Sequence, residues 1–136
     1  MKKEEKVEAE EVLCRLFKGG KIKHVGDGIR SDYFRLKIQA ADGQPLVITA
    51  ENKWTVSPVR SFFSLIAKQE EITDIFLGEQ EPHLTLQFTS GVLLTIFGVD
   101  NLYESWQAGT ESQDWLVVAC PSGDVAVWSP ENEENV

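Results

Sequence analysis

Hydrophobic and polar residues alternate along most of the chain, and this period of two predicts a protein built mainly from antiparallel β-strands. The segment 33–39 is typical, because every second residue in it is apolar. Turn pairs such as Asp-Gly at 42–43 separate neighbouring segments and favour hairpins. We expect strands at 21–25, 33–39, 45–50, 54–56, 71–77, 83–88, 92–97, 114–120 and 125–128, with 101–106 either a strand or one helical turn.

Two segments have the apolar spacing of a helix instead of a strand. The first ends at the pair Gly19-Gly20, and its apolar stripe consists of Ala9, Val12, Leu13, Leu16 and Phe17. The second begins at Ser57-Pro58, where serine favours the cap and proline the first helical position. The apolar face of this second helix is expected to consist of Val59, Phe62, Phe63 and Ile66.

The two halves of the chain resemble each other. Each half has a helix, then a strand followed by a hairpin, and we place the two related units at about 20–57 and 70–107. We therefore expect an α+β fold with a mostly antiparallel β-sheet and two helices. The expected organisation is an amphipathic helix at 1–20, one β-rich domain at 21–129 and an acidic, disordered tail at 130–136. The pattern leaves open whether the sheet forms a sandwich or an open barrel.

The net charge of −9, from 22 acidic and 13 basic residues, argues against a nucleic-acid partner and permits a basic protein partner. No apolar run is long enough to span a bilayer, and no apolar region follows the first lysines as in a signal peptide. We therefore expect a cytoplasmic protein with no membrane contact. Cys14 and Cys120 are expected to be free thiols, although sequence leaves their pairing open.

The sequence carries no recognisable catalytic or metal-binding pattern. His24 and His83 both lie in strand-like segments, and neither has a cysteine, a histidine or paired acids at the spacing of a metal site. No nucleophile or phosphate-loop motif is present either. We therefore expect no cofactor, no metal and no enzymatic activity.

The C-terminal third contains the most distinctive motifs, which are Tyr103-Glu104-Ser105-Trp106 and the segment from Cys120 to Trp128. They resemble the ending of an uncharacterised bacterial family, domain of unknown function 6188, whose members show Y-E-A-W followed by C-x-G-G-x-x-A-V-W. The chain departs from that pattern at Ser122, where the family usually has glycine. The resemblance implies a fold and carries over no activity and no site residues.

These motifs supply the candidate partner-contact residues, which are Tyr103, Glu104, Trp106, Asp124 and Trp128. The residues have two interpretations, because tryptophans fill cores as readily as they anchor partner surfaces. As a surface patch, they indicate a non-catalytic protein-interaction domain, such as an immunity-type inhibitor of a basic toxin. The alternatives are a small-ligand binding or sensing module with a pocket near the tryptophans, and a homodimer formed by edge strands.

Overall fold

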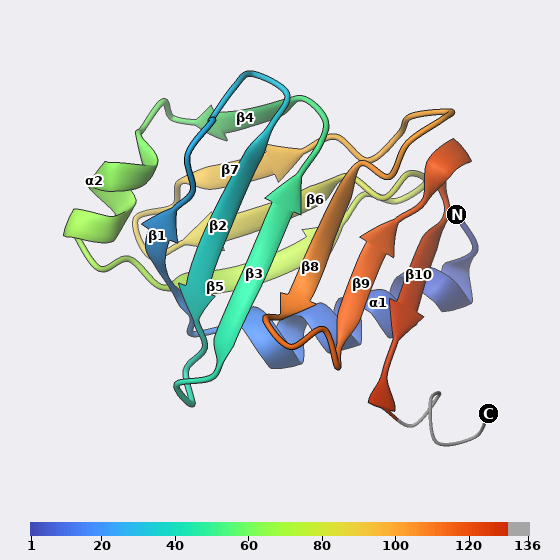
Figure 1. Ribbon diagram of the computed structural model, residues 1–136, viewed down its shortest axis with the longest axis horizontal. Coiled ribbons are helices and arrows are strands. Elements are labelled where there is room, and N and C mark those ends of the chain that lie inside the picture. Colours follow the sequence, from blue (N-terminus) through green and yellow to red (C-terminus); the bar gives the residue numbers. More distant parts are fainter. Residues whose placement is uncertain (131–136) are drawn as a thin grey trace.

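A computed structural model of the chain describes residues 1–130 and has the expected α+β architecture, with mostly antiparallel strands and two helices (Figure 1). The helices are α1 (Lys3–Phe17) and α2 (Phe62–Ala67), and a single 3-10 turn, η1, covers Pro121–Gly123. The strands are β1 (Lys21–Val25), β2 (Phe34–Gln39), β3 (Pro45–Ala50), β4 (Trp54–Ser57), β5 (Ile72–Leu77), β6 (Leu84–Phe88), β7 (Leu93–Ile96), β8 (Trp106–Thr110), β9 (Leu116–Ala119) and β10 (Val125–Trp128).

The strands form two separate sheets. The larger sheet has six strands in the order β1-β2-β3-β8-β9-β10, and the smaller has four in the order β4-β7-β6-β5. All neighbouring strands in both sheets are antiparallel. The sheets meet at one side, where an isolated bridge joins Lys21 to Glu71. The arrangement is therefore two sheets in contact, not one continuous barrel.

The order of the strands shows that the two halves of the chain exchange a strand. Strands β1, β2 and β3 form a meander in the larger sheet, and β5, β6 and β7 form one in the smaller sheet. The chain then leaves each meander for the other sheet, so that β4 pairs with β7 and β8 pairs with β3. Both first strands also contain a register shift, between Ile22 and His24 in β1 and between Ile72 and Asp74 in β5.

Helix α1 lies along one side of the larger sheet and contacts β5, β8, β9 and β10 (Figure 1). The apolar stripe expected from the sequence is buried as predicted, and it consists of Ala9, Val12, Leu13, Leu16 and Phe17. These residues belong to the same hydrophobic cluster as the inward faces of both sheets. The N-terminal helix is therefore part of the core of the domain.

The prediction for the second helix is wrong in its start and in part of its buried face, since Phe62 is buried and Ile66 packs against the core as expected. Strand β4 continues through Ser57, and α2 begins only at Phe62. Ser61 provides the cap, because its hydroxyl accepts a hydrogen bond from the Ser64 amide at 3.1 Å. The delayed start turns Phe62 and Leu65 inward and leaves Val59 and Phe63 86% and 69% exposed.

The segment 101–106 is neither a strand nor a helical turn, since the chain is irregular through 105 and β8 begins at Trp106. Sequence reasoning missed β8 because its small residues lack an apolar alternation. Gly109 is small for a packing reason, because a Cβ there would overlap the carbonyl of Trp115. Of the tail expected at 130–136, residues 131–136 lie outside the described residues. Within residues 1–130, neither helix has the length and the apolar character that crossing a membrane requires.

Candidate functional site

The chain crosses between the sheets twice, and the two crossovers lie against each other. The short crossover, residues 51–53, joins β3 to β4, and the long crossover, residues 97–105, joins β7 to β8. The Asn52 side chain connects them, because its Nδ2 donates to the Val99 carbonyl at 3.0 Å and to the Ser105 hydroxyl at 3.1 Å. The short crossover therefore supports the long one, which we call the 97–105 loop.

The tip of the 97–105 loop is closed by the side chain of Asp100. One carboxylate oxygen accepts hydrogen bonds from the amides of Leu102, at 2.8 Å, and Tyr103, at 3.0 Å. These bonds, with that from Leu102 contributing most, hold the pKa of the Asp100 carboxyl below its usual value. The Asp100 carbonyl also accepts a hydrogen bond from the Ser122 amide at 2.9 Å, which ties the loop to the turn before β10.

The base of the 97–105 loop is packed on the segment between β5 and β6. The Gly98 amide donates to Nδ1 of His83 at 2.9 Å, and the Phe97 ring meets the His83 ring edge-on at a centroid distance of 5.5 Å. No larger residue fits at position 98, because a Cβ would overlap the carbonyl of Pro82. The loop is therefore held at its base, along its length and at its tip.

Apolar side chains nevertheless point from this fixed loop into solvent. Leu102 is 76% exposed and Tyr103 is 67% exposed, while Phe97 and Val99 are partly exposed. An immobilised loop that presents apolar side chains loses little conformational entropy when a partner covers them. Such a surface is typical of a protein-binding site.

Carboxylates gather beside this apolar tip, around Cys120 at the end of β9. The pKa of the Cys120 thiol is raised, first by burial and then by the negative charges of Glu104, Asp124 and Glu5. The Oε2 atom of Glu5 is buried and finds no hydrogen-bond partner within residues 1–130. The surroundings of Cys120 beside the 97–105 loop are therefore acidic.

The structure brings together three of the five candidate residues expected from the sequence. Tyr103 and Asp124 are exposed and Glu104 is half-buried. Trp106 has no exposed surface, so its assignment to a surface patch is wrong. Its indole points inward and donates to the carbonyl of Pro82 at 2.7 Å, which satisfies its one polar atom inside the core.

Trp128 is exposed but lies away from the other candidates. Asp124 precedes β10 whereas Trp128 ends it, which separates them by about 13 Å at roughly 3.3 Å per residue. Trp128 pairs across the sheet with Leu116, and the Trp106 end of the same sheet pairs with Ala119. The five residues therefore do not form one patch.

Sequence reasoning missed Asn52, Asp100 and Leu102, which build or form the tip. Asp100 carried a usable signal, because an aspartate before an asparagine favours a turn closed by its own side chain. Asn52 gave no such signal, since its partners Val99 and Ser105 are distant in the sequence.

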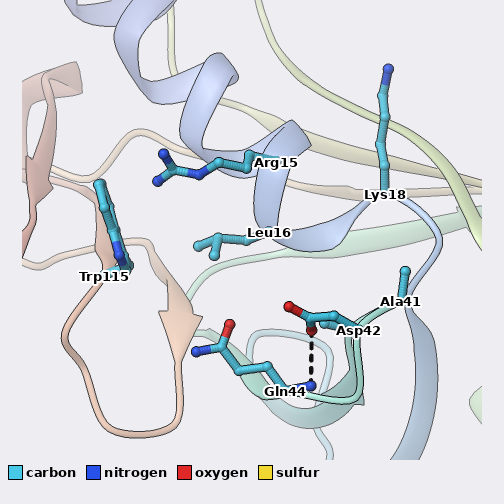
Figure 2. A pocket seen from close by; sticks show the side chains of 8 residues that line it. Arg15, Leu16, Lys18, Ala41, Asp42, Gln44 and Trp115 are labelled. Atoms are coloured by element: carbon cyan, nitrogen blue, oxygen red, sulfur yellow. Dashed lines mark hydrogen bonds between the residues drawn. The ribbon is translucent and has the colours of Figure 1, made fainter.

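A hollow lies between the C-terminal turn of α1, the β2–β3 hairpin and Trp115 (Figure 2). Its volume is about 310 Å³. The Arg15 guanidinium carbon lies 4.0 Å from the centroid of the Trp115 ring, and Gln44 and Lys18 line the remaining walls. Asp42 is occupied within the hairpin, because it accepts a hydrogen bond from the Gln44 amide at 3.0 Å.

The described part of the chain has no group of three or more histidine, cysteine or carboxylate side chains arranged to hold a metal ion. Cys14 and Cys120 are both free, and each thiol is partly buried. Burial is the main cause of a raised pKa at both cysteines, so neither is activated as a nucleophile.

No family model, no curated protein and no solved structure matches this chain.

Proposed function

We propose that this chain is a non-catalytic interaction domain of the cytoplasm that binds a basic protein through the 97–105 loop. The observation that carries the proposal is the contrast between the crossovers. Residues 51–53 suffice to pass from one sheet to the other, whereas the second crossover uses 97–105 and exposes Leu102 and Tyr103. The longer crossover exposes these apolar side chains although its backbone is held at both ends, and exposed apolar residues of this kind suit a partner surface.

The charges around the loop support a basic partner. Glu104, Asp124 and Glu5 lie close enough to Cys120 to raise the pKa of its thiol, and Asp100 stays ionised at the tip. A lysine or arginine of a partner would be attracted to these carboxylates while its apolar neighbours cover Leu102 and Tyr103. An inhibitor of a basic toxin, of the immunity type, would use such a surface.

The resemblance to domain of unknown function 6188 involves the same surface. Its two motifs in this chain include Tyr103 and Glu104 in the loop and the turn 121–124 beside it. We propose membership of that family, with the motif partly structural, through Trp106, and partly available for contact, through Tyr103.

The test is co-purification of the tagged chain with the proteins encoded by the genes that flank its own, at low and high salt. The double variant Leu102→Ala/Tyr103→Ala should weaken binding by about 30-fold or more, the effect of losing an interface hot spot. The matched control is Val59→Ala/Phe63→Ala, which removes two equally exposed apolar side chains at the α2 end. Equal loss in both variants, or retention in the loop variant, would contradict the proposal.

The hollow in Figure 2 favours a second candidate, a small-ligand binding module. The Arg15 guanidinium stacked on Trp115 is suited to an organic carboxylate, since arginine pairs with carboxylates in a planar geometry. A panel of organic carboxylates read by thermal unfolding tests it, because a ligand of the native state raises the midpoint. Arg15→Ala should abolish any shift that is observed.

A further inference from the structure

One imidazole nitrogen holds the base of the 97–105 loop. Nδ1 of His83 accepts the Gly98 amide hydrogen at 2.9 Å, and Nε2 of His83 lies 2.9 Å from Oε2 of Glu81. A backbone N–H can only donate, so Nδ1 carries no proton. A carboxylate can only accept, so Nε2 carries one. The geometry therefore fixes both the neutral form and the tautomer of His83.

The surroundings of His83 leave the Gly98 amide little freedom to find another acceptor. Gly98 is packed against the Pro82 carbonyl so closely that a Cβ would not fit. That carbonyl already accepts the indole N–H of Trp106 at 2.7 Å. The Phe97 ring meets the His83 ring edge-on, so His83 is packed against the loop it supports.

The charged groups near the ring come from its own segment and from α1. Glu81 is paired directly with His83, and Glu79 lies 3.8 Å from the Lys6 ammonium of α1. The Met1 amino group contacts the Gln80 carbonyl at 3.4 Å. The residues that pack on the ring from the 97–105 loop, Phe97 and Gly98, carry no charge. Because the His83 side chain is 32% exposed, solvent protons can reach it.

We propose that His83 is a positioning residue that holds the 97–105 loop in place only while its imidazole is neutral. Protonation would put a hydrogen on Nδ1, directly facing the Gly98 N–H, and two donors cannot bond to each other. The Gly98 amide would lose its acceptor and the base of the loop would separate from His83. Leu102 and Tyr103 are therefore held in place while the imidazole is neutral, and the loop that carries them loosens when the imidazole is protonated.

The inference that His83 regulates partner binding rests on the proposed function. The dependence of the loop on the protonation of His83 can be tested on the chain alone. In ¹⁵N-labelled protein, a scalar coupling across the hydrogen bond should connect the Gly98 amide to Nδ1 of His83 at about pH 8. The coupling should disappear as the His83 ring nitrogens titrate, and the exchange protection of the Leu102 and Tyr103 amides should fall by about tenfold or more. A coupling that is absent at high pH, or that survives the titration of His83, would overturn the inference.

Two variants separate titration from packing. In His83→Asn the side-chain oxygen takes the place of Nδ1 as an acceptor that does not titrate, so protection of the loop should become independent of pH. His24→Asn removes the other histidine, which is exposed on β1, and should leave the transition of the wild-type chain unchanged. A pH transition that persists in His83→Asn, or vanishes in His24→Asn, would assign the effect to another group.

The two proposals fail in different ways. If the loop loosens in acid but Leu102→Ala/Tyr103→Ala binds partners normally, the proposed function is wrong and the role of His83 stands. If the double variant loses binding while the Gly98 coupling persists in acid, the interaction surface stands and its control by His83 does not.

Discussion

The two crossovers make the same passage between the sheets in very different ways. The first uses residues 51–53 and the second uses 97–105, yet both end at a tryptophan whose indole nitrogen donates to a loop carbonyl at 2.7 Å. Trp54 bonds to Arg30 in the β1–β2 connection and Trp106 bonds to Pro82 in the β5–β6 connection. The two crossovers therefore end at the same kind of anchor and differ in their length.

The surroundings of the two tryptophans also differ. Trp54 is partly exposed and packs against the rings of Phe34 and Phe62, with centroid distances of 5.3 and 5.2 Å. Trp106 is entirely buried. The 97–105 loop packs through Gly98 on the same Pro82 carbonyl that anchors the buried Trp106, and it exposes Leu102 and Tyr103.

The largest expected effect breaks the anchor of the long crossover. Trp106→Ala should lower the free energy of unfolding by about 4 kcal/mol, because it leaves a large cavity and an unpaired Pro82 carbonyl. The control Trp128→Ala should change it by about 1 kcal/mol or less, since that side chain is 47% exposed. Urea unfolding followed by far-ultraviolet circular dichroism measures both. Equal losses would mean that the two tryptophans are equally part of the core.

A smaller effect tests whether the short crossover supports the long one. Asn52→Ala removes the hydrogen bonds to Val99 and Ser105 and should destabilise the protein by about 1–2 kcal/mol. Amide exchange should also increase in the 97–105 loop more than in β2. Asn101→Ala, at an exposed asparagine of the loop itself, is the control and should change neither quantity measurably. If Asn52→Ala also has no effect, the crossovers are merely adjacent.

The smallest effect concerns Asp100 and acid. Because its pKa is depressed in the folded chain, the Asp100 carboxylate stabilises the fold above the usual aspartate pKa of about 4, and this contribution is lost as pH falls through the folded value. Asp100→Asn should therefore lower stability above about pH 4, where the carboxylate is ionised, and leave it nearly unchanged at the acid end, so that stability depends less on pH. Thermal unfolding between about pH 2 and about pH 7 measures the difference. The same pH dependence in the variant and the wild-type chain would show that the amides of Leu102 and Tyr103 do not stabilise the charge.

Asp100 and His83 hold different ends of the 97–105 loop. Asp100 closes the tip and loses its stabilising charge below about pH 4, whereas His83 holds the base through Nδ1. Comparing the two variants in one series therefore assigns each part of the pH dependence to one end of the same loop.

Much of the fold followed from side-chain alternation. The β2 and β3 strands and their Asp-Gly turn were predicted because each places apolar residues at every second position. The α1 helix could be predicted because its apolar residues have helical spacing. They have that spacing because they are buried in the core shared by both sheets. Alternation reports which face of a strand is buried and carries no information about which sheet the strand joins. The exchange of β4 and β8 between the sheets therefore could not be predicted from the alternation.

The errors have local causes. Two serine signals compete before α2, and the capping bond at Ser61 prevails over the Ser57-Pro58 pair because β4 still needs Ser57 for its pairing with Leu93. Trp106 was assigned to a surface because tryptophan suits both environments, and only its partner Pro82, distant in the sequence, decides between them. Tyr103 and Glu104 were found from their motif, whereas the Asn52 support depends on contacts between distant residues.

The exchanged strands also set the order in which the molecule can be completed. When a ribosome has produced the first meander, β3 still lacks the neighbour that will later cover its outer side, and this neighbour is β8, at 106–110. Until then the backbone groups of β3 are open to any other chain in an extended conformation. A nascent chain stalled before residue 106 would thus be prone to aggregate, and neither half could serve as an independent module in a fusion protein.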